Sequence, residues 1–113
     1  MNDLKDLALK YFKTFSRKDL AGLAVMFDDH VSLRDWEVSV SGKTSVLGTN
    51  KNIFDNVETI TVTPLRLHQD TNTVAAEILI DVYDNNGVGV TLLVVDVIEF
   101  VGDKIKSIRA YRG

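Results

Sequence analysis

The chain has 113 residues, with 13 basic and 16 acidic side chains, a net charge of −3 and no cysteine. A chain of this length predicts one domain, residues 1–113, with a hydrophobic core of its own. The charge balance provides no broad basic field, so neither nucleic acid nor a membrane surface is an expected partner. The lack of cysteine excludes disulfides, thiolate metal sites and cysteine nucleophiles.

The first residues, Met1 to Lys5, do not show the basic segment followed by an apolar segment that marks a secretory signal. The longest apolar runs are far too short to cross a bilayer. We therefore expect a cytoplasmic protein.

The first half of the sequence has the periodicity of helices. One apolar stripe recurs at spacings of three and four residues, as in an amphipathic helix: Leu4, Leu7, Ala8, Tyr11, Phe12 and Phe15. Asp19 is typical of an N-cap and predicts a short second helix, which ends at the acidic pair 28–29. A first strand then begins with Val31 and Leu33 on its apolar face, and residues 43–54 predict a third, weaker helix.

From Glu58 onward the period becomes two, which predicts strands. At Pro64 the apolar phase shifts by one residue, which indicates a bulge or bend at a sheet edge. Residues 74–84 and 88–101 predict two strands joined by a tight turn, and 104–112 predict the last strand. Helices followed by a meander of long strands predict an α+β fold, with N-terminal helices packed in a strongly bent antiparallel β-sheet.

The predicted strand 88–101 is apolar on both of its faces. Val94 and Ile98 share one face with Asp96, and Val95 and Val97 lie on the other. Three short helices can cover only one face of the sheet, and a second subunit is the simplest cover for the other. We therefore expect a homodimer through the outer sheet face.

Asp96 lies in the middle of this apolar strand. An isolated carboxylate buried there would cost several kcal/mol, about as much as a whole domain is stable by. The residue is therefore expected to be paired, hydrogen-bonded, held protonated, or exposed by an unusual architecture. An acid at a surface edge, or one paired across a dimer, is the structural alternative to a role in chemistry.

A resemblance to a known family covers essentially the whole chain. Residues 24–35, AVMFDDHVSLRD, are similar to a common signature of the NTF2-like (SnoaL-like) cone superfamily, in which a bent sheet wraps around helices and leaves an interior pocket. Residues 94–100 and 104–111 resemble the last two strands of the ketosteroid Δ5-isomerases, the closest likeness within that superfamily. The resemblance implies an NTF2-like/cystatin-like cone.

The likeness to the isomerases also implies three catalytic residues. Asp35 matches the general base that moves a proton between two carbons of the substrate, and Tyr11 and Asp96 match the two donors of the oxyanion hole. In that family an apolar site keeps the second acid neutral near neutral pH. Tyr11 is then expected to hydrogen-bond Asp96, which would make the burial of this acid tolerable.

Several positions depart from the isomerase pattern. Phe27 and Asn50 stand where these enzymes can carry tyrosines. Trp36 replaces a usual proline, and Arg112 lies near a wall that would contact a steroid. We therefore expect a small-molecule ligand that is smaller or more polar than a steroid, and neither a metal nor an organic cofactor. The expected substrate-binding residues are Phe15, Trp36, Phe54, Ile78, Ile80, Leu92, Val94, Ile108, Ala110 and Arg112.

Other interpretations of the same residues stay open. Asp35 at a strand end can be a turn acid rather than a base. The chain can be a non-catalytic ligand-binding or dimerisation module of the same superfamily. A dehydratase or hydrolase would need a histidine beside Asp35, either His30 or His68. Glu77 and Asp81 are expected to face outward, but a different hairpin register would turn them into the pocket.

Overall fold

The computed structural model describes residues 3–113; Met1 and Asn2, part of the N-terminal segment considered above, lie outside the described residues. The helices are α1 (Leu4–Ser16), α2 (Leu20–Met26) and α3 (Lys43–Asp55). The strands are β1 (Phe27–Arg34), β2 (Ser39–Ser41), β3 (Thr59–Asp70), β4 (Thr73–Tyr83), β5 (Gly89–Val101) and β6 (Lys104–Arg112). None of the helices described has the length and apolar character that crossing a membrane requires.

Side-chain hydrogen bonds mark the start of α2 and hold the end of α1 against the sheet. The Asp19 carboxylate accepts a hydrogen bond from the backbone N–H of Gly22 at 2.9 Å, which confirms the predicted N-cap of α2. Ser16, in the last turn of α1, accepts a hydrogen bond from the backbone N–H of Val62 at 2.9 Å. This bond ties the end of α1 to β3 and helps to fix the helix against the sheet.

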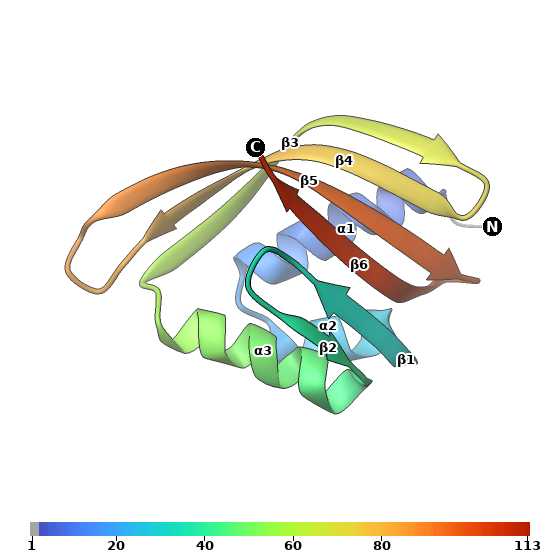
Figure 1. Ribbon diagram of the computed structural model, residues 1–113, viewed down its shortest axis with the longest axis horizontal. Coiled ribbons are helices and arrows are strands. Elements are labelled where there is room, and N and C mark those ends of the chain that lie inside the picture. The colour runs from blue at the N-terminus through green and yellow to red at the C-terminus, as the bar shows by residue number, and fades with distance from the viewer. Residues whose placement is uncertain (1–2) are drawn as a thin grey trace.

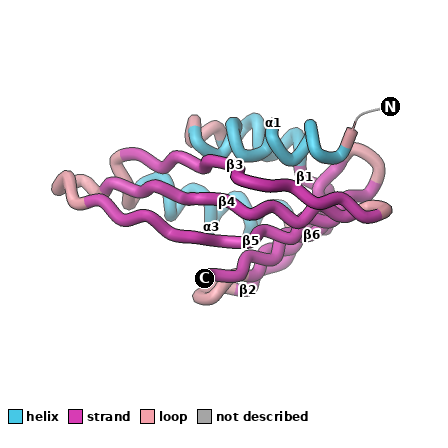
Figure 2. The backbone as a smooth tube through the Cα atoms, turned by 90° about the horizontal axis from the view of Figure 1, so that it is seen from above, coloured by secondary structure: helices cyan, strands magenta, loops and turns pink. Residues whose placement is uncertain are grey.

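The strands form one six-stranded sheet in the order β2-β1-β6-β5-β4-β3. Strands β3 to β6 are the predicted antiparallel meander, and a register shift between Pro64 and Arg66 confirms the predicted bulge in β3. Gly87 has a φ of 81° in the turn between β4 and β5, a conformation that favours glycine. The sheet curls strongly, and the helices lie on its inner side (Figure 1, Figure 2).

The hydrophobic core fills the space between the helices and the inner face of the sheet. Its largest fully buried side chains come from both layers, with Phe12 on α1, Leu23 on α2 and Ile98 on β5. Each such side chain contributes roughly 1.5–3 kcal/mol when it leaves water. The core therefore holds α1 and α2 against the sheet and sets the position of every residue that these helices carry.

The N-terminal half differs from the sequence prediction in three details. Helix α2 ends at Met26, before the acidic pair, and Phe27 already belongs to β1. Phe27 pairs with Ile105 of β6 and packs against the ring of Tyr11 at 6.3 Å, so tertiary packing decides this boundary. Strand β2 was not predicted, because three residues show no period. Strand β1 pairs in parallel with β6, so the sheet is mixed there rather than wholly antiparallel.

The outer face of the sheet has no cover within residues 3–113. Leu93 and Tyr111 are about half exposed on it, at 53% and 49%. Val97 lies on the same face, opposite Arg109, whose guanidinium donates a hydrogen bond to Glu99 at 2.6 Å. This face therefore combines exposed apolar side chains with a partly buried ion pair.

Candidate functional site

The inner face of the sheet and helices α1 and α3 line an open cavity of about 510 Å³. Most of the side chains that line it are apolar, and only a few are polar or charged. A cavity with this volume and lining is typical of a site for a small molecule. Helix α1, helix α3, the turn after β1 and strands β3 to β6 all contribute to its walls.

Most of the residues predicted for the site line this cavity: Tyr11, Asp35, Asp96, Phe15, Trp36, Ile80, Leu92, Ile108, Ala110 and Arg112. The three candidate catalytic residues come from separate elements, with Tyr11 on α1, Asp35 after β1 and Asp96 on β5. The fold therefore brings three groups that are far apart in the sequence to the walls of one cavity.

Phe54, Ile78 and Val94, also predicted to line the cavity, lie in the packed core instead. Ile78 and Val94 pair with each other across β4 and β5, and each is 1% exposed. The ring of Phe54 packs edge-on against that of Phe15, with 4.9 Å between their centroids. Strand parity places Ile78 and Val94 on the correct face, but parity alone does not show where along a strand the cavity begins.

The cavity also includes residues that were not predicted: Leu33, Glu37, Asn50, Ile53, Val57, Ile60, Val82 and Val90. Val82 and Val90 are paired in the β4–β5 hairpin and continue its inward alternation, which could have identified them. Asn50 lies four positions from both Val46 and Phe54 on α3, and all three are buried. That spacing marks one face of a helix and could have placed Asn50 inside.

Asp96 is buried, with 8% of its surface exposed. Burial in the apolar wall is the main cause that raises its pKa to about 7, and the nearby negative charge of Asp35 raises it further. No residue of the described chain donates a hydrogen bond to the Asp96 carboxyl group. A large fraction of the molecules therefore carries a neutral carboxylic acid here at neutral pH, and this group can donate a hydrogen bond.

Tyr11 is 5% exposed, and its ring packs among those of Phe12, Phe15 and Phe27 at 5.5, 6.1 and 6.3 Å between centroids. Burial, and after it the negative charge of Asp96, raises the pKa of the phenol above its usual range, so Tyr11 stays protonated. The expected hydrogen bond between Tyr11 and Asp96 is absent within residues 3–113. Both groups line the cavity as separate donors.

Asp35 lies in a tight turn after β1, and backbone groups hold its side chain in place. Its Oδ1 atom accepts hydrogen bonds from the N–H groups of Glu37 at 2.7 Å and Val38 at 2.8 Å. This arrangement is an Asx-turn, so Asp35 is the turn acid that the sequence left open. Its Oδ2 atom makes no hydrogen bond to any described residue, and the same side chain lines the cavity. The turn role and a role as base are therefore compatible.

Trp36 and Arg112 lie together at the rim of the cavity. The central guanidinium carbon of Arg112 is 5.9 Å from the centroid of the Trp36 ring, a cation–π distance. Trp36 is 41% exposed and Arg112 is also exposed, while both line the cavity. The rim thus presents a flat aromatic surface and one positive charge to an entering ligand.

Neither histidine lines the cavity. His30 is exposed on β1, and His68 on β3 bonds to the carboxylate of Glu77 at 2.9 Å on the outer face. Glu77 and Asp81 do not line the cavity either, as expected from their strand parity. A dehydratase or hydrolase that depends on a histidine beside Asp35 thus lacks that residue. Across residues 3–113, no three His, Cys, Asp or Glu side chains group as metal ligands.

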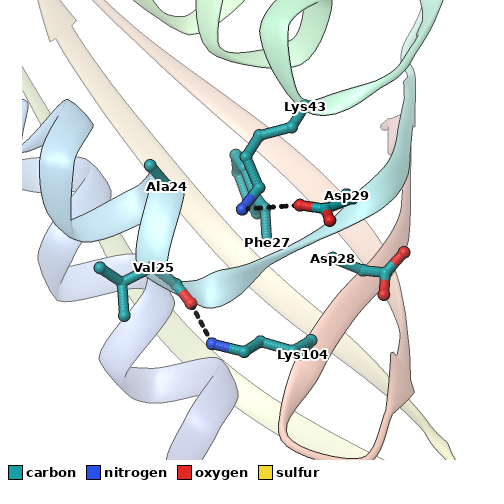
Figure 3. Close-up of a pocket in the computed structure, with 7 residues that line it drawn as sticks. All are labelled: Ala24, Val25, Phe27, Asp28, Asp29, Lys43 and Lys104. Atoms are coloured by element: carbon teal, nitrogen blue, oxygen red, sulfur yellow. Dashed lines mark hydrogen bonds and ion pairs between the residues drawn. The ribbon is translucent and has the colours of Figure 1, made fainter.

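A second hollow, of about 490 Å³, lies where α2 passes into β1. Figure 3 shows that its two lysines turn toward partners in the chain: Lys43 pairs with Asp29 at 3.3 Å, and Lys104 donates to the backbone carbonyl of Val25 at 2.6 Å. The carbonyl of Val25 belongs to the last turn of α2, so Lys104 caps that helix. Both cations serve the fold, and the cavity lined by Tyr11, Asp35 and Asp96 is the stronger candidate site.

The model of the SnoaL-like domain matches residues 8–108 of the chain. No protein of curated function matches the sequence. A hypothetical protein with a ketosteroid isomerase-like fold from Catenulispora acidiphila DSM 44928, crystallised in complex with trimethylamine, is 13% identical. Its TM-score is 0.86, and the match covers 93% of this chain and 83% of that one.

Two further solved structures are similar. An LEH-like epoxide hydrolase from M. tuberculosis is 15% identical, with a TM-score of 0.86 over 96% of this chain and 80% of that one. A putative SnoaL-like polyketide cyclase from Shewanella denitrificans OS-217 is 12% identical, with a TM-score of 0.87 over 96% and 89%. At such identities the likeness establishes the fold alone.

Proposed function

This chain belongs to the SnoaL-like domain family, and from that premise we propose that its cavity binds a small carbonyl compound and moves a proton at the carbon next to the carbonyl group. The reaction is an isomerisation of the ketosteroid isomerase type, on a substrate that is smaller or more polar than a steroid. Asp35 is the general base, and Tyr11 and Asp96 are the donors to the carbonyl oxygen.

The mechanism follows from the chemistry of a β,γ-unsaturated ketone. Asp35 takes a proton from the carbon between the carbonyl and the double bond, which leaves a dienolate. The negative charge develops on the oxygen, where the phenol of Tyr11 and the neutral acid of Asp96 each donate a hydrogen bond. Asp35 then returns the proton to the γ-carbon, so the double bond moves into conjugation and the base is restored.

The observation that carries this proposal is the raised pKa of Asp96, together with its position in the same cavity as Asp35. Two carboxyl groups in one cavity, with one kept neutral by burial, supply an acid and a base at the same pH. The backbone N–H groups of Glu37 and Val38 both donate to the Oδ1 atom of Asp35 and so orient its carboxyl group. The free Oδ2 atom of Asp35 is then available to accept a proton.

The rim and the relatives support a small or polar substrate. Arg112 and Trp36 occupy the rim together, which favours a ligand whose outer end is polar or negatively charged. The related protein from Catenulispora acidiphila holds trimethylamine, a molecule far smaller than a steroid.

A non-catalytic ligand-binding module is the second candidate. The Asx-turn favours this candidate, because the two backbone hydrogen bonds that Asp35 accepts explain an acid at this position without any catalytic role. In such a module the cavity would bind its ligand without exchanging any of the ligand's protons.

One experiment distinguishes the isomerase from the binding module. NMR, with the protein in excess, measures how fast the α-protons of cyclohexanone exchange for deuterium. If the protein is an isomerase, the exchange must depend on Asp35. A second assay tests turnover: ultraviolet absorbance measures the conversion of a β,γ-unsaturated cyclohexenone to its conjugated isomer. Asp81→Asn is the matched control, because Asp81 is outside the cavity. Exchange that is equal in wild-type protein and in Asp35→Asn would leave only the binding module.

We also propose that two copies of the chain associate through the outer face of the sheet. Leu93 and Tyr111 leave exposed apolar surface at the centre of this face, and Val97 lies between them and the strand end. A second copy would remove this surface from water.

A further inference from the structure

Asn50 is a polar residue of the cavity to which the proposed mechanism gives no role. It lies on α3, lines the cavity and is 2% exposed. Its amide nitrogen Nδ2 is buried and has no hydrogen-bond partner within residues 3–113. Almost all buried polar groups in proteins are paired, because an unpaired one costs free energy. An unpaired amide in a cavity wall therefore calls for a partner that comes from outside the chain.

The packing of α3 does not explain an asparagine at this position. Val46 and Phe54, one turn away on either side, are buried apolar residues that belong to the hydrophobic core. Leucine has a similar size and a higher helix propensity than asparagine. An apolar residue would therefore suit the fold of the empty protein better than Asn50 does.

We propose that Asn50 is a specificity-determining residue whose amide N–H donates a hydrogen bond to an oxygen atom of the ligand. The ligands that it selects carry a carbonyl, ether or hydroxyl oxygen on the side that meets α3, and hydrocarbons of the same shape are disfavoured. A site built to bond such an oxygen rejects the analogue that lacks it, because the amide is then left unpaired. The inference rests on the proposed function only in taking this cavity as the binding site.

The chain contains its own reporter for the test. Trp36 is the one tryptophan of the sequence, and it lines the cavity. Its fluorescence can follow titrations with indanone and with indane, two probes of the same ring shape that differ in one carbonyl oxygen. We expect wild-type protein to bind indanone more tightly than indane. In Asn50→Leu the affinity for indanone falls about fivefold and that for indane does not fall, as the loss of one hydrogen bond requires.

Thermal unfolding separates this role from a structural one. Asn50→Leu removes an unpaired buried polar group, so the melting temperature of the protein without ligand stays the same or rises. Asn50→Met also removes the amide N–H donor and adds no titratable group, so it must lose the preference for indanone as well; this variant decides the matter if the leucine variant does not fold. Asn52→Leu is the matched control, because Asn52 is exposed on the same helix and changes neither affinity.

Three results would overturn the inference: wild-type protein that does not distinguish the two probes, an Asn50→Leu variant that binds indanone as wild-type protein does, or variants that lose stability and both probes together. Neither probe has a β,γ double bond to move, so these affinities are independent of turnover. A protein that discriminates the probes through Asn50 and exchanges no α-protons would refute the proposed isomerase and leave this inference standing.

Discussion

Asp35 and Asp96 face one cavity, and the negative charge of Asp35 adds to burial in raising the pKa of Asp96 to about 7. Burial of Asp96 in the apolar wall is the larger of the two causes. A change at Asp35 therefore alters the proton affinity of Asp96.

The first prediction concerns stability against pH. In the unfolded chain Asp96 ionises near its ordinary pKa of 3.8, and in the folded chain near 7. Because the folded pKa is the higher one, the contribution of Asp96 to the free energy of unfolding is fully present below about pH 4. It is lost as the pH rises through 7. Each pKa unit corresponds to about 1.4 kcal/mol, so wild-type protein loses roughly 4 kcal/mol relative to Asp96→Asn over this range.

This loss is measured by urea unfolding of both proteins between pH 4 and pH 8. The comparison cancels the other acids, which the two proteins share. A difference in unfolding free energy that stays constant with pH would show that Asp96 ionises normally, and the proposed donor would be lost with it.

The second prediction concerns the base. Asp35→Asn removes the proton acceptor, so the rate of the cyclohexenone isomerisation should fall at least about a hundredfold. The melting temperature should change little, because the asparagine oxygen can still accept the N–H groups of Glu37 and Val38. The pKa of Asp96 should fall, because a negative charge beside it is gone, and carbon NMR of its carboxyl group measures that shift.

Asp35→Ala provides the structural comparison for this variant. It removes both turn hydrogen bonds and should cost about 1–2 kcal/mol of stability. If Asp35→Asn proves as unstable as Asp35→Ala, the acid serves the turn rather than the reaction.

The third prediction concerns the phenol donor. Tyr11→Phe keeps the ring among Phe12, Phe15 and Phe27 and removes only the hydroxyl group. Turnover should fall about a hundredfold, in line with the loss of one oxyanion donor, while stability is retained. Tyr83→Phe, at a half-exposed tyrosine outside the cavity, is the control for the same chemical change. Full activity of Tyr11→Phe would remove Tyr11 from the mechanism.

The fourth prediction concerns assembly. Val97→Asp places a charge in the outer face of β5, and a dimer formed there should dissociate, because a buried unpaired carboxylate is costly. Analytical ultracentrifugation reports the mass directly. Val25→Asp makes the same change at a valine that is 67% exposed on α2, and it should leave the mass unaltered. Dimers that persist in Val97→Asp would place the interface elsewhere.

The fifth prediction concerns the link between α1 and the sheet. Ser16→Ala loses the acceptor for the N–H of Val62 and should cost about 1 kcal/mol, measured by chemical unfolding. Thr49→Ala is the comparison: like Ser16, Thr49 donates to the carbonyl four residues earlier, but its hydrogen bond is exposed and joins no second element. Equal costs for the two variants would mean that the bond to Val62 adds nothing.

Periodicity predicted the parts of this fold that have a local cause. The stripe on α1, the N-cap at Asp19 and the bulge after Pro64 each depend on neighbours in the sequence, and all three are confirmed. Strand parity also placed Asp96 on the inner face. The parallel pairing of β1 with β6 has no such signal, because it joins two segments that are far apart in the sequence.

The limits of the cavity escaped prediction for a related reason. Val94 and Asp96 share one strand face, yet only Asp96 lines the cavity, because the filling of the core decides where the empty space begins. In the sequence, Asn50 is one of several polar residues on a weakly amphipathic helix. Only the structure shows that its amide nitrogen is buried without a partner. The missing bond between Tyr11 and Asp96 likewise depends on side-chain placement that no spacing specifies.

The position of β6 between β1 and β5 has a consequence for the order in which the chain assembles. Strands β1 and β2 emerge early in synthesis and pair with each other, but the other edge of β1 has no partner strand until β6 has been made. The segment of β1 that carries Val31 and Leu33 therefore joins the rest of the sheet only after the last strand has been made. Contacts this distant in sequence slow folding and lengthen the time in which a nascent chain can aggregate.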